Sequence, residues 1–220
     1  MKINVHAGHN PDGKKACGAV GLINESTEAR KVKSEVINLL KLLGHTVYDC
    51  TEDNGKSQSD VLSKIVKKCN ANKVDLDVSI HFNAGGGQGT EVLIYDSKSQ
   101  SKGCAENTAK AISELGYKNR GVKIRPELYV LKKTTAPAML IECCFVDSKE
   151  DVKKYNYKTM AQAIVKGITG QTVKEIEEEG INTDKPTVYR VQVGAFNKKA
   201  NAEALAKELK DKGYKVQIVK

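Results

Sequence analysis

The sequence predicts an α/β protein: a mostly parallel, twisted sheet covered by helices on both faces, with a small βαβ half-domain at the C-terminus. Strand-like apolar runs alternate with segments of helical periodicity, as in units that wind around a parallel sheet. The 220 residues suffice for one core of ordinary size and a small appendage. With 40% hydrophobic and 29% charged residues, the composition is that of a globular chain.

The first two strands are expected at residues 2–6 and 45–50, with one amphipathic helix between them. Apolar residues that recur at three- and four-residue intervals predict this helix: Ala29, Val32, Val36, Leu40 and Leu43. Gly44 follows the last of them, where a residue without Cβ readily takes the left-handed conformation that ends a helix. A second helix is expected at residues 59–72.

The same alternation continues to residue 170. The expected elements are strands at 75–82 and 89–95, a helix at about 101–115, strands near 127–132 and 138–143, and helices from 148 to 170. Residues 1–170 therefore form one domain around a central sheet.

A linker and a short tail are expected after this domain. Residues 171–186 carry an acidic run followed by Gly, Asn, Asp and Pro, with little to bury. Residues 187–220 have strand, helix and strand signals, and their apolar residues are Val191, Val193, Ala202, Leu205, Ala206, Leu209, Val216 and Ile218. Because a unit below about 40 residues rarely buries enough surface to fold alone, the tail is expected to need a partner.

Charge and hydropathy exclude two classes of partner. No apolar run approaches the roughly 20 residues of a membrane helix, so no membrane insertion is expected. The N-terminus lacks the apolar core of a secretory signal peptide, so synthesis in the cytoplasm is expected. The net charge of +9 is spread along the chain without an aromatic-interleaved basic stripe, so no nucleic-acid partner is expected. The 6 Cys lack a CxxC spacing and are interpreted as thiols that pack as small apolar residues.

Four polar residues stand where predicted strands end or the first helix begins. Loops beyond the carboxyl ends of the strands form the site in an open α/β sheet. His9, His81 and Glu142 lie at or just after the ends of three strands, and Glu25 opens the first long helix. Two His and one carboxylate are ligands of a catalytic zinc that keeps its fourth position open. Such a site also needs a carboxylate that handles protons, for which Glu142 is the candidate.

The start of the first helix leaves two assignments open. Glu25 is also a residue that the helix dipole favours at an N-terminus, so it need not be a ligand. Glu28, one turn further on, is the rival ligand. Either Asn24 or Ser26 provides the N-terminal cap.

The remaining site residues also have structural alternatives. A His at a strand end often only makes a hydrogen bond, and His6 is the alternative ligand to His9. Glu142 follows Met-Leu-Ile, where burying a carboxylate without a partner is costly. Glu142 is therefore the strongest functional candidate of the four.

These residues stand in blocks that resemble a known family. AGHN with His9, NE with Glu25, VSIHFNA with His81 and the run at 119–147 resemble the zinc-dependent N-acetylmuramoyl-L-alanine amidases (amidase type 3) of cell-wall hydrolases and phage endolysins. The likeness covers roughly residues 2–168, and every block is in family order.

This resemblance implies a peptidoglycan hydrolase that lyses bacterial cell walls. It implies one Zn²⁺ per catalytic domain, held by His9, Glu25 and His81. It also implies that Glu142 is the catalytic glutamate in cleavage of the amide bond between N-acetylmuramic acid and L-alanine. Asn83, close behind His81, is a candidate substrate contact.

Two positions depart from the family pattern. Asn10 and Pro11 follow the loop His where the family often has a second Gly, which is interpreted as loop variation. Cys143 and Cys144 replace the usual Gly after the catalytic Glu, which is expected to alter how the following turn closes.

The tail resembles a sporulation-related repeat (SPOR) domain through YRVQVGAF, the AEALAKEL helix and GYKVQIV. That resemblance implies binding to glycan strands stripped of their stem peptides, although the tail covers only half of the usual βαββαβ unit. Two tails from two chains would rebuild the unit, so a homodimer through residues 187–220 is expected. The basic charge suits an anionic cell wall. Together these features are typical of a phage lysin, or of a mother-cell lysis enzyme, that reaches the wall after release.

Overall fold

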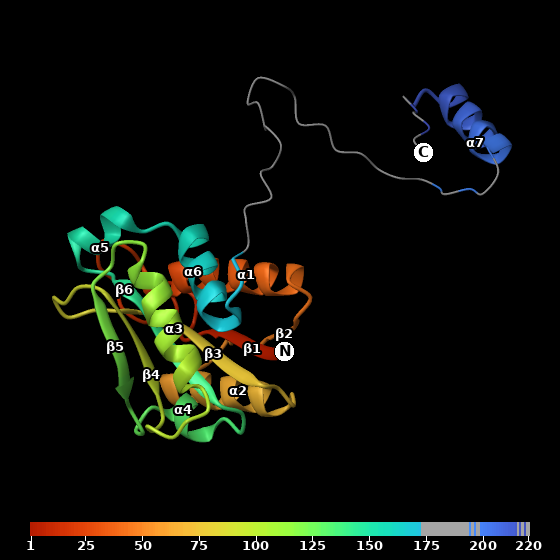
Figure 1. Cartoon of the computed structure of the whole chain (residues 1–220). Coiled ribbons are helices and arrows are strands. Elements are labelled where there is room, and N and C mark those ends of the chain that lie inside the picture. The colour runs from red at the N-terminus through yellow and green to blue at the C-terminus, as the bar shows by residue number, and fades with distance from the viewer. Residues whose placement is uncertain (173–193, 195, 197–198, 215, 217, 219–220) are drawn as a thin grey trace. The chain divides into compact units, whose positions relative to one another are not determined.

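The computed structural model describes residues 1–172, 194, 196, 199–214, 216 and 218 (Figure 1). The chain divides into two compact units, Met1–Lys174 and Glu175–Lys220. No helix among the described residues combines the length and the hydrophobicity that crossing a bilayer requires.

The first unit is built on a six-stranded sheet with the order β2-β1-β3-β6-β4-β5. Its strands are β1 (Lys2–Ala7), β2 (Thr46–Asp49), β3 (Leu76–Asn83), β4 (Thr90–Ile94), β5 (Asn119–Ile124) and β6 (Ala138–Phe145). All neighbouring strands are parallel except β4 and β6, which are antiparallel. The central strands β1 and β3 are buried along almost their whole length, because both faces of the sheet are covered.

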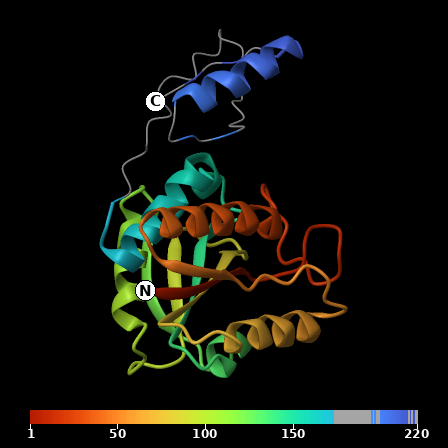
Figure 2. The ribbon, with the colours of Figure 1, turned by 90° about the vertical axis from the view of Figure 1, so that its right-hand side faces the viewer.

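Helices cover the two faces of this sheet, and Figure 2 shows α1 and α6 above it and α2 and α4 below it. The helices are α1 (Glu25–Leu42), α2 (Gln58–Asn70), α3 (Lys102–Ser113), α4 (Tyr129–Lys133), α5 (Lys149–Lys154) and α6 (Tyr157–Thr169). The larger core lies under α1, α3 and α6, and its fully buried side chains include Ile3, Leu40, Ile80, Ile112 and Ile164. A smaller core under α2 and α4 includes Val61, Ile65, Val130, Leu131 and Leu140. The predicted α/β class, with a mostly parallel sheet between helices, is therefore confirmed.

The predicted strand near 127–132 is wrong. This segment contains α4, and the strand that precedes it is β5, which the sequence analysis did not predict. Val130 and Leu131 are adjacent in the chain and are both buried in the smaller core, whereas neighbours in a strand point to opposite faces. β5 is an edge strand without a fully buried residue, so it lacks the apolar alternation that identifies a strand.

Local signals account for where the main helices begin and end. Asn24 caps α1, since its Oδ1 accepts a hydrogen bond from the amide of Thr27 at 3.1 Å. Gly44 has the left-handed φ of 81° expected after the last turn of α1. The predicted helical stretch from 148 to 170 is two helices, capped by Ser148 and Asn156.

The cysteines are all free thiols. Cys50, Cys69, Cys143 and Cys144 are buried, as predicted, whereas Cys17 and Cys104 are only half-buried.

The second unit contains α7 (Lys199–Asp211), which agrees with the helix predicted in the tail. Among the residues of this unit that the structure describes, Ala206 is buried, at 8% exposure. The first predicted strand of the tail, with Val191 and Val193, lies outside the described residues. So does most of the predicted linker.

Candidate metal centre and active site

Three candidate residues meet at the carboxyl edge of the sheet because their strands are neighbours. His9 follows β1, His81 lies near the end of β3 and Glu142 lies in β6, and these strands are adjacent in the order β1-β3-β6. Glu25 is added from the first turn of α1, which packs on β1 and β3. Residues far apart in the chain are thereby brought to one place.

Glu25 lies between the two imidazoles. Its Oε1 is 3.0 Å from Nδ1 of His81 and 3.3 Å from Nε2 of His9. The other carboxylate oxygen accepts a hydrogen bond from the amide of Ala19 at 2.7 Å, which orients the group. Burial by itself would raise the pKa of Glu25, but the hydrogen bonds to His81 and His9 outweigh it and hold the pKa well below its usual range. The group is therefore an anion at neutral pH.

The three side chains could hold a metal ion. One ligand atom from each of His9, Glu25 and His81 lies within 4.8 Å of the other two. The rings of His9 and His81 are 4.9 Å apart and nearly perpendicular, at 81°. Two imidazoles and one carboxylate form the donor set of a catalytic zinc site with an open position.

Neither rival ligand lies in this cluster. Glu28 bonds to Nζ of Lys31 at 2.8 Å and accepts a hydrogen bond from the hydroxyl of Tyr155 at 3.0 Å. His6 is fully buried in β1, with its Nδ1 3.4 Å from Oγ of Ser79. Burial lowers the pKa of His6 to about 3, so it is a neutral core residue.

Two glycines leave room for the ligand side chains. A Cβ on Gly8 would lie 1.8 Å from Cε1 of His81, which is impossible without moving the ring. A Cβ on Gly18, which has a φ of +81°, would lie 2.5 Å from Oε2 of Glu25. No local sequence pattern shows which side chain Gly18 faces, so its role could not be predicted.

Glu142 carries an oxygen atom that has no partner. Its Oε2 is buried and makes no hydrogen bond with any of the described residues. Burial raises the pKa of Glu142 to about 8, and the carboxylates of Glu25 and Glu91 add to this effect while Arg125 opposes it. A carboxyl group with a pKa near neutrality can both accept and donate a proton in one reaction.

A second buried carboxylate, which the sequence analysis missed, lies beside Glu142. Glu91 pairs with Glu142 across the antiparallel strands β4 and β6. Its oxygens accept hydrogen bonds from Nε of Arg120 at 2.8 Å and from Nδ2 of Asn83 at 3.0 Å. An acidic residue inside the apolar run GTEVLIY was the available signal, because such a residue needs a partner when it is buried.

A bulge places Arg120 over this carboxylate. Thr90 pairs with Asn119 but Val92 pairs with Val122, so β5 holds one extra residue at this point. The guanidinium of Arg120 also lies 5.1 Å from the centre of the Phe145 ring. Asn83, the candidate substrate contact, is thus part of a fixed polar group next to Glu142.

The turn after β6 is held by the carboxylate of Asp151 and not by a glycine. Cys143 and Cys144 are both completely buried. Oδ2 of Asp151 accepts hydrogen bonds from the amides of Phe145 at 3.0 Å and of Gly89 at 2.8 Å. The two thiols therefore pack in the core while Asp151 holds the turn.

Comparison with known proteins identifies related families. The family model described as N-acetylmuramoyl-L-alanine amidase matches residues 3–171, and the model of the SPOR domain matches residues 185–220. Both resemblances predicted from the sequence are confirmed by these matches.

Individual relatives agree with the family models. An uncharacterised protein of Clostridium perfringens (strain 13 / Type A) is 37% identical over 190 residues, which cover 82% of this chain and 55% of that protein. The N-acetylmuramoyl-L-alanine amidase CwlM of Bacillus licheniformis is 30% identical over 168 residues, covering 74% of this chain and 63% of the relative. This chain therefore spans less than two thirds of the length of these curated relatives.

A solved structure of a related catalytic domain matches about four fifths of this chain. The catalytic domain of the CD27L endolysin targeting Clostridia Difficile superposes with a TM-score of 0.73 at 28% identity. The match covers 79% of this chain and 99% of that domain.

Proposed function

Since this chain belongs to the N-acetylmuramoyl-L-alanine amidase family, we propose that it is a zinc-dependent hydrolase that cleaves the amide bond between N-acetylmuramic acid and L-alanine in peptidoglycan. The observation that carries this proposal is the cluster of His9, Glu25 and His81 next to Glu142, whose buried Oε2 has no partner. Cleavage of this bond across the wall would cause lysis of the bacterium.

The residues at the edge of the sheet have distinct roles in this reaction. His9, Glu25 and His81 would hold one Zn²⁺ per catalytic domain. When bound at such a site, zinc activates a water molecule and polarises the scissile carbonyl. Glu142 accepts a proton from the attacking water and then passes it to the departing nitrogen of L-alanine. The raised pKa of its buried carboxyl group favours the protonated form that the second transfer requires.

The surroundings of Glu142 support the second transfer. Arg120 and Asn83 hold Glu91 in place, so a fixed anion stands beside Glu142 and favours its protonated form. We propose that Asn83 also contacts the substrate, because its half-buried side chain follows His81 at the same edge of the sheet.

The experiment that tests this function is an analysis of the ends created in purified peptidoglycan. An amidase creates new L-alanine N-termini and causes loss of turbidity. A zinc deacetylase or a peptidase would share the metal but would not create these termini. Activity should disappear when a chelator removes the metal and return with added zinc, and the absence of new L-alanine N-termini would refute the amidase assignment.

We propose that the chain has three functional segments. Residues 1–170 are the catalytic domain, residues 171–186 a linker and residues 187–220 a partial wall-binding unit, in line with the SPOR match. Since a single tail is half of such a unit, we propose that two chains associate through their tails to bind glycan strands. The proposed place of action is the bacterial cell wall.

A further inference from the structure

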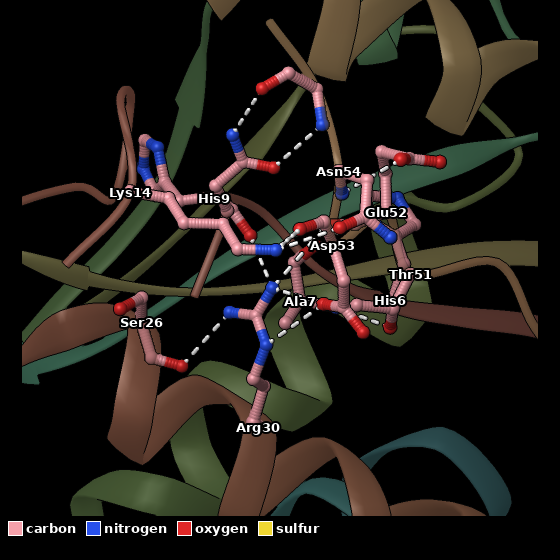
Figure 3. A network of polar contacts seen from close by, with 12 residues as sticks. His6, Ala7, His9, Lys14, Ser26, Arg30, Thr51, Glu52, Asp53 and Asn54 are labelled. Carbon is pink, nitrogen blue, oxygen red and sulfur yellow. Dashed lines mark hydrogen bonds and ion pairs between the residues drawn. The ribbon is translucent and has the colours of Figure 1, made fainter. Parts of the chain in front are cut away.

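Arg30 bonds to three segments of the chain, one of which carries His9 (Figure 3). Its Nη2 donates to the main-chain carbonyl of His9 at 2.6 Å, and its Nη1 donates to the carbonyl of Ser26 at 3.0 Å. Nη2 and Nε also donate to Oδ1 of Asp53, at 2.6 and 3.1 Å. One guanidinium thus joins the loop that carries His9, the helix turn that carries Glu25 and the loop after β2.

Hydrogen bonds of the residues on both sides of His9 also hold this loop. On one side of His9, the amide of Gly8 donates to the carbonyl of Ile80 at 3.2 Å. On the other side, Asn10 is clamped between the carbonyls of Lys15 and Gly55, both at 2.7 Å. Among the described residues, the main-chain carbonyl of His9 itself is held by Arg30.

Lys14 fastens the far end of the same loop. Its Nζ donates to the carbonyl of Asp53 and to Oδ1 of Asn54, both at 2.7 Å. Lys14 therefore joins the His9 loop to the 51–54 segment, and Arg30 joins the same segment to α1.

We propose that Arg30 is a positioning residue that sets the zinc affinity of the site by fixing His9 relative to Glu25. The proposal rests on the proposed function only for the identity of the metal. The two ligands come from different segments, and Nε2 of His9 lies 3.3 Å from Oε1 of Glu25. Without the guanidinium, the main chain of His9 would lose its direct hydrogen bond to α1, and zinc would have to order the His9 loop on binding.

The chemistry of the contacts favours arginine over lysine at this position. A planar fork with several N–H donors can reach two carbonyls and a carboxylate at once, whereas an ammonium is a point donor on a flexible stem. Asp53 forms an ion pair with the guanidinium, so the positive charge of Arg30 is balanced by a carboxylate. Arg30→Lys should therefore keep the ion pair with Asp53 and lose the simultaneous hydrogen bonds to the two carbonyls.

The same helix offers a matched control. Lys33 lies one turn further along α1 and bonds to Oδ2 of Asp49 at 2.7 Å, so it also ties α1 to the segment around β2. Among the described residues, its ammonium group makes no hydrogen bond or ion pair to the three ligands. Lys33→Met therefore removes a similar ion pair without releasing the His9 loop.

The test is the zinc dissociation constant of the full chain, measured on metal-free protein by competition with a chromophoric chelator. Arg30→Met is expected to weaken zinc binding by about 10- to 100-fold, as for other residues that orient metal ligands. Lys33→Met is expected to leave the constant unchanged, and Arg30→Lys is expected to fall between wild type and Arg30→Met. In the zinc-free protein, hydrogen exchange of peptides covering residues 8–18 should rise in Arg30→Met and not in Lys33→Met.

Equal zinc affinity in Arg30→Met and wild type would overturn the proposal, as would equal weakening in Lys33→Met. If Arg30→Met does not fold, Arg30→Lys takes its place: weaker zinc binding than wild type supports the proposal, and equal zinc binding overturns it. A wild-type protein that binds zinc without cutting peptidoglycan removes the proposed function and leaves this proposal standing. A wild-type protein that binds no zinc overturns both.

Discussion

His81 and Glu142 occupy paired positions on the neighbouring parallel strands β3 and β6. Paired residues on adjacent strands project from the same face of a sheet, so a candidate ligand and the candidate proton carrier lie side by side. The register is interrupted directly after this pair, between His81 and Asn83. His81 and Glu142 are therefore the last regularly paired residues before the irregularity.

Glu142→Gln should retain zinc and lose hydrolysis. The amide keeps the shape of the side chain and leaves the three proposed ligands untouched, but it cannot accept a proton. The rate of peptidoglycan cleavage should fall by at least about 100-fold. Zinc content and turbidity loss of purified walls, measured on the same preparation, check this, and near-normal turnover in zinc-replete protein would contradict the mechanism.

His9→Ala and His81→Ala should each lower zinc occupancy, because the three ligands act as a set. The fold should survive, since the metal binds to a preformed sheet. Glu25→Ala should lose zinc as well, whereas Glu28→Ala is the control, because Glu28 bonds to Lys31 and Tyr155. Metal analysis of the purified variants decides, and normal zinc in Glu25→Ala with loss in Glu28→Ala would reassign the third ligand.

Gly8→Ala should damage the site although it replaces none of the functional side chains. The new Cβ would meet the ring of His81 at 1.8 Å and displace it. A displacement of about 1 Å can cost about 100-fold in rate, so a loss of this order is expected. The control is Gly103→Ala in α3, where an added Cβ meets nothing within 4 Å. Wild-type kinetics of peptidoglycan cleavage in Gly8→Ala would show that the ring can relax.

His6 should make the fold sensitive to acid. Burial lowers its pKa from 6.5 to about 3. Between these values the unfolded chain binds a proton and the folded chain does not, so the free energy of unfolding decreases as the pH falls. The decrease is about 2 kcal/mol at pH 5 relative to pH 7. Urea unfolding of metal-free protein at both pH values checks this: His6→Gln should lose less stability than wild type, and an equal loss would refute the prediction.

Removal of the tail should change the oligomeric state. The whole chain should be a dimer and residues 1–170 a monomer, because the proposed association uses only the tail. Light scattering or sedimentation on both proteins measures this directly. A monomer in both cases would rule out the dimer.

Local residue patterns were sufficient to predict much of this molecule. Apolar periodicity predicted the order of strands and helices, and a polar residue at the end of an apolar strand identified His9, His81 and Glu142. Such signals are carried by neighbours in the chain, so they are visible without a structure. β5 and α4 were missed because an edge strand and a single helical turn bury too few residues to produce a period.

Only the tertiary structure decided the questions that depend on distance. Whether Glu25 or Glu28 faces the two imidazoles depends on the rotation of α1 against the sheet, and both lie in its first turn. The partners of Glu91 and the clamp made by Arg30 join segments that no local pattern connects. The sequence determined which chemical groups are present and on which elements they lie. The packing of those elements determined which groups meet, because contact between distant residues is a property of the folded core.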